Sequence, residues 1–140
     1  MKKKNGFTLV ELLAVVVIMA IIALVAVPNV VSMLERNKKK QMVSDAKEMF
    51  NKFQNKITLG TLKCEKTCKS TLNDLGLSSK QDGYGDEYDD TSSITYDNGT
   101  FTITLTTDKH CLNKTGITNS ENFSITIEDV LDVSDGTCSN

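Results

Sequence analysis

One acidic residue lies inside a long apolar stretch near the start of the chain. Across residues 7–27 the only charged side chain is Glu11, and nearly all the others are aliphatic or methionine. A carboxylate within a segment of membrane-spanning length is costly to insert, and such residues usually have a function and a named partner. Glu11 is therefore the first candidate functional residue, and it requires a countercharge.

Four cysteines and a single histidine could also form a site. They are Cys64, Cys68, Cys111, Cys138 and His110. An even number of cysteines on a chain that leaves the cytoplasm predicts disulfides. Zinc is the alternative, but the sequence has no CxxC pair and its one imidazole directly precedes a cysteine. His110 has no Ser or Asp partner motif, so we expect it at the surface or at a strand end.

An acidic, glycine-containing loop follows residue 81. Its aspartates Asp82, Asp86, Asp89 and Asp90 are candidate calcium ligands, because calcium prefers several carboxylates on a flexible loop. The spacing is not that of an EF-hand, and a solvated acidic loop is the alternative. No other cofactor is expected. Nucleotide-binding loops, metalloprotease helices and Ser-His-Asp order are absent from the sequence, so we expect a protein that is not an enzyme.

The apolar segment is long enough to cross a membrane. At 1.5 Å per residue, residues 7–27 form roughly 31 Å of helix. The lysines at positions 2–4 should keep the N-terminus in the cytoplasm and place the bulk of the chain outside. A secretory signal peptide would be shorter and would end in an A-x-A-like site, which residues 24–26 lack. A plain signal anchor is the other alternative, and neither explains Glu11.

The stretch GFTLVELL, which begins at Gly6 behind a short lysine-rich leader, closely resembles the class III prepilin signal of type IV pilins and pseudopilins. The resemblance covers about the first 30 residues. It implies cleavage between Gly6 and Phe7 by a membrane aspartyl peptidase, followed by N-methylation of Phe7. Glu11 then becomes the fifth mature residue, where the family has a glutamate. Pro28 becomes the twenty-second, where many pilins have a helix-bending proline.

The residues themselves fit these roles. A glycine before the cut lets an extended backbone enter a protease cleft without a side chain in the way. After cleavage, the amine of Phe7 on one subunit and the carboxylate of Glu11 on its neighbour can neutralise each other, which removes two isolated buried charges. We expect this pairing to set the axial register of an incoming subunit. The alternative is that Glu11 only extends toward the membrane interface.

The resemblance also implies a function and a location. We expect a subunit of a homo-oligomeric helical type IV pilus, which serves adhesion, twitching motility or DNA uptake. Expected partners are other pilins, the prepilin peptidase, and a membrane assembly platform with its ATPase. The chain would span the cytoplasmic membrane once before assembly and then form an extracellular filament on the cell surface. The alternatives are a pseudopilin of a secretion or competence system, or a monomeric signal-anchored binding domain. The net charge of −2 does not indicate DNA binding.

Beyond Pro28, apolar residues recur at helical spacing. They are Met42, Val43, Ala46, Met49, Phe50, Phe53 and Ile57. We expect one helix from about Thr8 to Thr58, with a bend at Pro28 and its second half packed on a head. The expected organisation is a cleaved leader at 1–6, a transmembrane and filament-core segment at 7–28, an amphipathic half-helix at 29–58 and a head at 59–140.

Strand patterns in the head predict an α+β fold. Alternating apolar residues flank Asn98-Gly99, which favours a type I′ hairpin with Tyr96 opposite Phe101 and Ile94 opposite Ile103. Alternation over residues 123–127 predicts a third strand. We expect an antiparallel sheet of three or four strands packed on the helix, which is the pilin fold.

Two local features complete the predicted head. The pattern Thr71-Leu72-Asn73-Asp74 is typical of the start of a short helix, which would end near Gly76. Four cysteines allow three pairings, and the sequence does not choose among them. We prefer Cys64–Cys68 and Cys111–Cys138, because many pilins have a comparable disulfide-bounded C-terminal loop.

Overall fold

The computed structural model describes residues 6–133 and 138, and the chain divides into two compact units, Met1–Glu35 and Arg36–Asn140. A 50-residue helix, α1, runs from Leu9 to Thr58, close to the predicted bounds. Pro28 lies inside α1 and the helix continues through it. The side chains of Asn29 and Ser32 bond the carbonyl oxygens of Val25 and Pro28, at 3.1 and 3.2 Å. The bend at Pro28 stays a prediction.

The described part of the first unit, residues 6–35, is the first half of α1 and the three residues before it. Every one of these residues is exposed. Residues 12–27 of this segment carry only apolar side chains, and α1 is long and apolar enough, by length and composition, to cross a membrane. A helix with no polar face has to be surrounded by lipid or by other protein.

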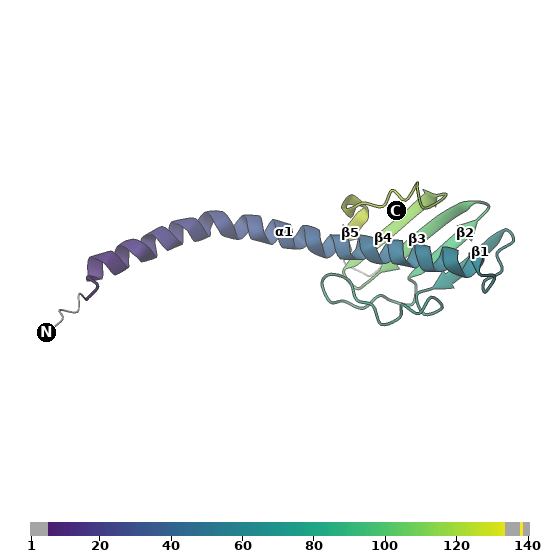
Figure 1. Cartoon of the computed structure of the whole chain (residues 1–140), viewed down its shortest axis with the longest axis horizontal. Coiled ribbons are helices and arrows are strands. Elements are labelled where there is room, and N and C mark those ends of the chain that lie inside the picture. The colour runs from purple at the N-terminus through teal and green to yellow at the C-terminus, as the bar shows by residue number, and fades with distance from the viewer. Residues whose placement is uncertain (1–5, 134–137, 139–140) are drawn as a thin grey trace. The chain divides into compact units, whose positions relative to one another are not determined.

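The second unit is the predicted α+β head. The second half of α1 lies along one face of an antiparallel sheet (Figure 1). Its apolar stripe is buried as predicted, with Met42, Ala46, Met49, Phe50 and Phe53 at 1% exposure or less. The ring of Phe50 packs edge-on against Phe101 of the sheet, with ring centroids 4.9 Å apart. The core therefore sits between the helix and the sheet.

The sheet has five strands in sequential order, one or two more than predicted. They are β1 (Thr67–Thr71), β2 (Ser93–Asp97), β3 (Thr100–Thr106), β4 (His110–Ile117) and β5 (Val130–Asp132). Each pairs antiparallel with the next, so the sheet is a meander in which β1 and β5 form the edges.

The predicted hairpin is confirmed in its register. Tyr96 lies opposite Phe101 and Ile94 lies opposite Ile103 across β2 and β3. Asn98 and Gly99 both have positive φ angles, 46° and 93°, as a type I′ turn requires. Ile94, Ile103 and Phe101 are buried against α1, so the alternation identified the inner face correctly.

The predicted third strand at 123–127 is wrong. These residues form no strand, and a short 3₁₀ turn, η1, covers Ile127–Asp129. Their alternation still reports burial, since Ile125 is buried while Ser124 and Thr126 are exposed. The strand next to β3 is instead β4, whose polar sequence HCLNKTGI alternates poorly because a register shift near Phe101 and Ile103 interrupts the ladder. β5 then takes the outer edge of β4.

The short helix predicted after Thr71 is also wrong. Thr71 ends β1, and the residues up to Gly76 form turns. The predicted bonds nevertheless exist, because the Thr71 N–H donates to Asp74 Oδ2 at 2.8 Å. These bonds lower the pKa of Asp74. Gly76, with φ of +70°, stops the turn before a helix can grow.

Candidate functional site

The predicted cleavage junction lies ahead of the long helix. Gly6 and Phe7 are outside α1, which begins at Leu9. The side chain of Phe7 is 87% exposed. The Gly6–Phe7 bond therefore lies in an exposed segment outside any helix or strand, which is accessible to a protease. Leader residues 1–5 lie outside the described residues, so the cytoplasmic placement of the lysines at positions 2–4 stays a prediction.

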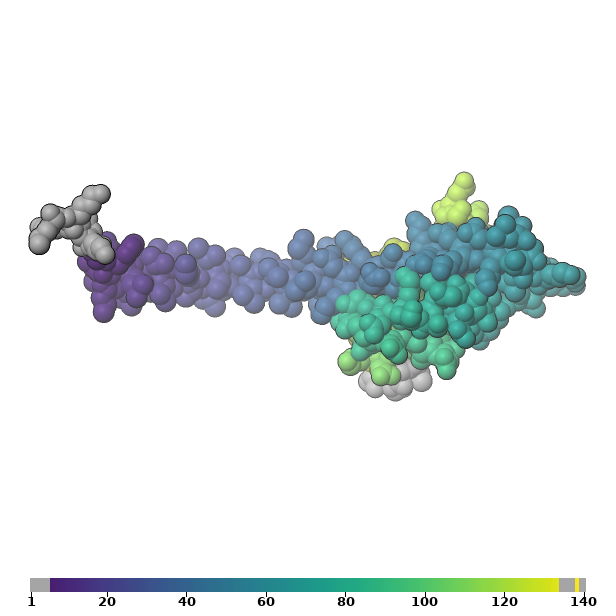
Figure 2. Space-filling model, turned by 60° about the horizontal axis from the view of Figure 1, so that its bottom comes forward, coloured from purple at the N-terminus to yellow at the C-terminus, as the bar shows by residue number. Residues whose placement is uncertain are grey.

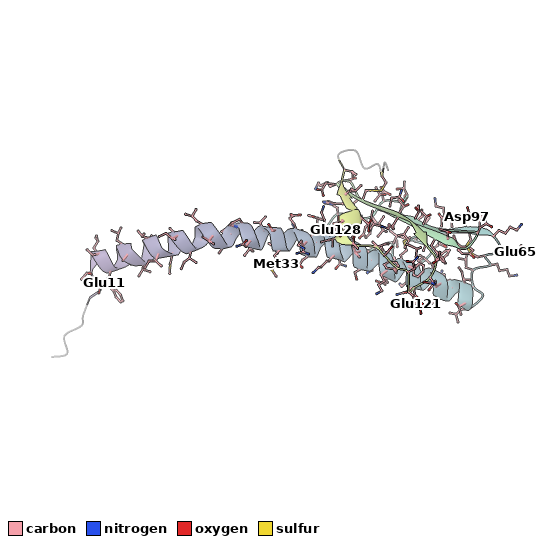
Figure 3. All side chains as sticks on the ribbon, turned by 90° about the horizontal axis from the view of Figure 1, so that it is seen from above. Glu11, Met33, Glu65, Asp97, Glu121 and Glu128 are labelled. Atoms are coloured by element: carbon pink, nitrogen blue, oxygen red, sulfur yellow. A yellow bond between two sulfur atoms is a disulfide. The ribbon has the colours of Figure 1, made fainter. Side chains whose placement is uncertain are left out.

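Glu11 sits in the first turn of α1 (Figure 3) and closes a capping box with Thr8. The backbone N–H of Thr8 donates to Glu11 Oε2 at 2.8 Å, and the Thr8 hydroxyl donates to the same oxygen at 2.9 Å. The Glu11 N–H lies 3.3 Å from the Thr8 hydroxyl oxygen and donates to it. Both residues thereby satisfy groups that the start of a helix leaves unbonded.

Thr8 is the functional residue that the sequence-based prediction missed. The signal was present, because Thr8-Leu9-Val10-Glu11 has the S/T-x-x-E spacing of a capping box directly before an apolar run. The box holds the carboxylate through Oε2, and none of the described residues bonds Oε1.

The head contains a separate polar centre that holds a loop against α1. The loop between β1 and β2 runs along the helix (Figure 2). Two side chains of this loop donate hydrogen bonds to Asp45 of α1, which is 1% exposed. Tyr88 Oη and Lys80 Nζ each lie 2.9 Å from an Asp45 oxygen, and Gln41 Nε2 adds a bond at 3.2 Å. Burial and the Asp45 carboxylate raise the pKa of Tyr88. Asp45 was missed because a charged residue at one position of an apolar stripe does not disturb its periodicity.

Gly83 marks where the same loop comes closest to the helix. A Cβ at this position would overlap the backbone of Lys38 in α1. The absent side chain therefore permits a backbone-to-backbone approach that no other residue allows. This approach places the aspartates of the loop beside the start of β4.

The four predicted calcium ligands do not form one set. Asp82 and Asp86 lie together, and the third side chain beside them is His110 rather than Asp89 or Asp90. Asp89 instead caps the turn before β2, where its Oδ1 accepts from the Thr91 N–H at 2.8 Å. The calcium assignment itself stays a prediction.

His110 is the first residue of β4, as expected of a strand-end residue, but the expectation of a surface position is wrong. Its side chain is 8% exposed. Nδ1 lies 3.0 Å from Asp82 Oδ2, and the ring stacks on Tyr84 with centroids 3.8 Å apart. No local sequence pattern indicates this pairing, because 28 positions separate the two partners.

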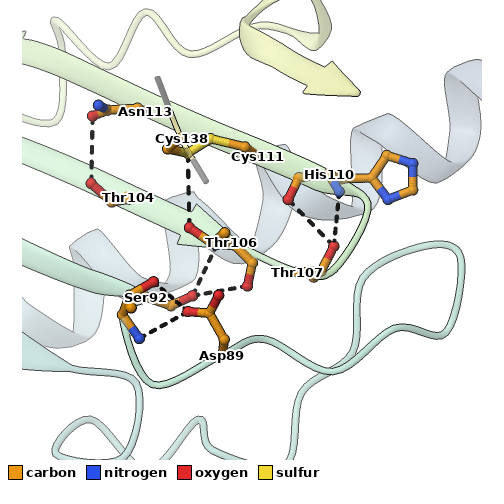
Figure 4. Close-up of a disulfide and its surroundings, with 10 residues drawn as sticks. Asp89, Ser92, Thr104, Thr106, Thr107, His110, Cys111, Asn113 and Cys138 are labelled. Atoms are coloured by element: carbon orange, nitrogen blue, oxygen red, sulfur yellow. Dashed lines mark hydrogen bonds between the residues drawn. A yellow bond between two sulfur atoms is a disulfide. The ribbon is translucent and has the colours of Figure 1, made fainter. Parts of the chain in front are cut away.

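Both disulfides join the pairs that were preferred from the sequence. Cys64 bonds Cys68, and Cys111 bonds Cys138. The second bond attaches residue 138 to β4, next to the Thr106 hydroxyl (Figure 4). The described residues contain no free cysteine, since all four are in these two disulfides.

Comparison with known proteins identifies the N-terminal segment. Residues 1–27 match the family model described as the prokaryotic N-terminal methylation motif. The chain thus carries the class III prepilin signal of type IV pilins and pseudopilins within residues 1–27. The match supports a pilin-like or pseudopilin-like subunit of a surface or secretion system, and a structural protein. Neither the curated proteins nor the solved structures gave a match.

Proposed function

We propose that this chain is a structural subunit that polymerises into a type IV pilus on the bacterial surface after the leader is removed at Gly6–Phe7 and Phe7 is N-methylated. The observation that carries the proposal is the first half of α1. All its residues are exposed, residues 12–27 are all apolar, and the segment carrying Glu11 lies within a match to the methylation motif. The pilus would serve adhesion, twitching motility or DNA uptake.

An all-apolar helix is stable only where other apolar groups surround it. In the membrane, lipid surrounds it, and in a filament the same helices of neighbouring subunits do so. Apolar burial is similar in the two states, so the hydrophobic effect alone gives assembly no direction. We infer that an ATPase with a membrane platform supplies that direction, and that the prepilin peptidase acts before it.

The capping box explains how Glu11 can serve both states. In the single chain, the carboxylate is bonded by Thr8 and is not left without a donor. In the filament, Oε1 would accept the Phe7 amine of the adjoining subunit while Oε2 keeps its bonds to Thr8. The neighbour's amine then neutralises the carboxylate only at one axial position, which fixes the register of the incoming subunit.

Mass spectrometry of the N-terminus and of sheared surface material tests the proposal. The mature chain should begin at N-methylated Phe7 and should be the dominant protein of the sheared fibres. An intact Met1 would contradict both processing and polymerisation. A processed chain that is missing from sheared fibres would instead identify a pseudopilin of a secretion or competence system.

Glu11→Ala tests the pairing. The variant should be processed and methylated at normal levels. Its incorporation into fibres should fall at least about tenfold, because leaving the neighbour's Phe7 amine buried and unpaired costs several kcal/mol. Glu121→Ala is the matched control, because it removes an exposed carboxylate from the head. Normal fibres from the Glu11 variant would contradict the pairing.

A further inference from the structure

The head, residues 36–133, contains a cluster of ionisable side chains that the proposed function does not use. Asp82, Asp86 and His110 each offer one ligand atom, and these three atoms lie within 4.8 Å of one another. Asp82 and His110 are buried, with side chains 1% and 8% exposed. Asp86 is partly buried, at 26%. Two buried ionisable groups, one of them a carboxylate, beside a second carboxylate form a far rarer arrangement than an acidic surface loop.

Asp86 provides an independent indication of a ligand. Its Oδ2 is shielded from solvent and, among the described residues, receives no hydrogen bond. A buried carboxylate oxygen without a donor is costly, and native structures usually provide a partner, often an ion. The cation nearest to it is the ammonium of Lys109, which lies 3.5 Å away on a side chain that is 70% exposed. That ammonium can leave, because most of its side chain is in solvent.

We propose that Asp82, Asp86 and His110 bind one divalent transition-metal ion, with Zn²⁺ as the representative. An imidazole nitrogen with two carboxylates suits zinc, whereas calcium takes oxygen ligands. Tetrahedral ligands about 2.1 Å from zinc lie roughly 3.4 Å apart. Asp82 Oδ2 and His110 Nδ1 are already 3.0 Å apart. Rotation of the partly exposed Asp86 side chain brings in the third ligand, and water takes the fourth position.

The surrounding charges favour this mode of binding. The contact between His110 Nδ1 and Asp82 Oδ2 requires a proton, since each atom otherwise acts only as an acceptor, and the ion replaces that proton. The other ring nitrogen, Nε2, faces Asp132 Oδ1 at 3.7 Å. A carboxylate on the far side of a ligating imidazole fixes its orientation. Lys39, whose Nζ is 3.5 Å from the same Asp132 oxygen, and Lys109 are the opposing cations.

The ion would fasten the loop between β1 and β2 to the sheet. Asp82 and Asp86 belong to that loop, whereas His110 opens β4 and precedes Cys111 of the second disulfide. Backbone N–H groups of Tyr84 and Asp86 already bond Asp82 Oδ1, at 2.8 and 3.1 Å, so the first ligand is held in place without the ion. Metal binding should therefore stabilise the folded head.

The test uses the full chain in detergent, purified without a polyhistidine tag and treated with a chelator. Zinc should bind at one ion per chain, measured by competition with a chromophoric chelator, and should raise the Tm by about 5 °C or more. His110 is the only histidine of the chain, so its imidazole resonances in an NMR spectrum should shift on zinc addition. Calcium at the same concentration should produce neither effect.

Three variants make the result specific. Asp86→Asn should weaken zinc binding at least about tenfold, as loss of a ligand usually does. Lys109→Gln should strengthen it several-fold, because it removes the competing ammonium. Asp89→Asn, in the same loop, should leave the affinity unchanged. The Tm of each variant without metal verifies that it is folded.

Three results would overturn the zinc site. The first is no binding below about 100 µM zinc, a concentration at which even a weak three-ligand site would be occupied. The second is equal affinity in the parent chain and the Asp86 variant. The third is stabilisation by calcium as large as that by zinc.

Discussion

Thr8 and Glu11 bond each other at the first turn of α1, with the Thr8 N–H and hydroxyl both donating to one carboxylate oxygen at 2.8 and 2.9 Å. The residue expected to pair with a neighbouring subunit is thus already held by its own chain. The box fixes where the carboxylate points, and it lies between the proposed cleavage site and the apolar helix. Thr8 should therefore influence assembly through Glu11.

Thr8→Val tests this relationship with a side chain of nearly the same shape. The variant loses the hydroxyl that donates to Glu11, so the carboxylate becomes less well placed and incorporation into fibres should fall several-fold, less than for Glu11→Ala. The double variant should be no worse than Glu11→Ala alone, because Thr8 acts through the carboxylate. Fibre yield, normalised to the amount of methylated mature chain, is the measurement.

Thr8→Ser is the matched control for this experiment, since it keeps the hydroxyl and should form fibres at the parent level. A double variant far below Glu11→Ala would show that Thr8 has a separate role. Normalisation to processed chain keeps a defect in cleavage from being counted as a defect in assembly.

The local patterns predicted much of this fold because they act over short distances. The bounds of α1, its buried stripe and the hairpin register at Asn98-Gly99 depend on residues within a few positions of each other. The strand β4 was not predicted because its apolar and polar residues alternate poorly, although it pairs with β3 along its length. Residues 123–127 alternate well between apolar and polar side chains, but they pair with no strand. Strand pairing is decided by tertiary context, which one segment does not contain.

The polar centres of the head were unpredictable for a related reason. Asp45 bonds Lys80 and Tyr88, which lie 35 and 43 positions away in the sequence. His110 contacts Asp82, which lies 28 positions away. No short motif records such contacts. The N-terminal motif, in contrast, lies within six residues of sequence, and a family model matches the segment that contains it, while the roles of Gly6, Phe7 and Glu11 stay predictions.

Asp45→Ala should destabilise the head strongly. The substitution removes the buried acceptor of Tyr88 Oη and leaves Lys80 Nζ only its pair with Glu48, 2.7 Å away, and losing a buried hydrogen bond to a charged acceptor costs about 1.5–3 kcal/mol. The free energy of unfolding of the full chain in detergent, from a urea titration followed by circular dichroism, should fall by that amount. Lys52→Ala is the control, because its pair with Glu48 is 40% exposed on both sides and contributes at most about 0.5 kcal/mol. A loss below 1 kcal/mol for the Asp45 variant would contradict the role of this centre.

Tyr88 should make the head sensitive to alkaline pH. Its pKa is raised in the folded state by burial and by the Asp45 carboxylate, whereas in the unfolded chain it is about 10. Because the folded-state pKa lies above the unfolded value, the contribution of protonated Tyr88 to the free energy of unfolding is complete below about pH 10. It is lost as the pH rises further. The free energy of unfolding should decrease above about pH 10, and one tyrosinate should appear at 295 nm only as the secondary structure is lost.

Tyr88→Phe identifies the residue responsible. It removes the group that must ionise on unfolding, so the variant should lack the late tyrosinate signal, and its stability should depend less on pH above 10. Full ionisation of all three tyrosines in a chain that keeps its circular dichroism spectrum would show that Tyr88 is not held by Asp45.

The two disulfides should differ in their effect on stability, because they close loops of different size. The Cys111–Cys138 bond spans 27 positions and the Cys64–Cys68 bond spans four. In the chain-entropy model, these loops correspond to about 3.5 and about 2 kcal/mol. Replacing Cys111 and Cys138 by serine should therefore lower the Tm more than replacing Cys64 and Cys68, with the second pair serving as the matched control. Peptide mapping without reduction should first recover both bonds, and a peptide that joins Cys64 to Cys138 would refute the pairing and with it the predicted order of the two variants.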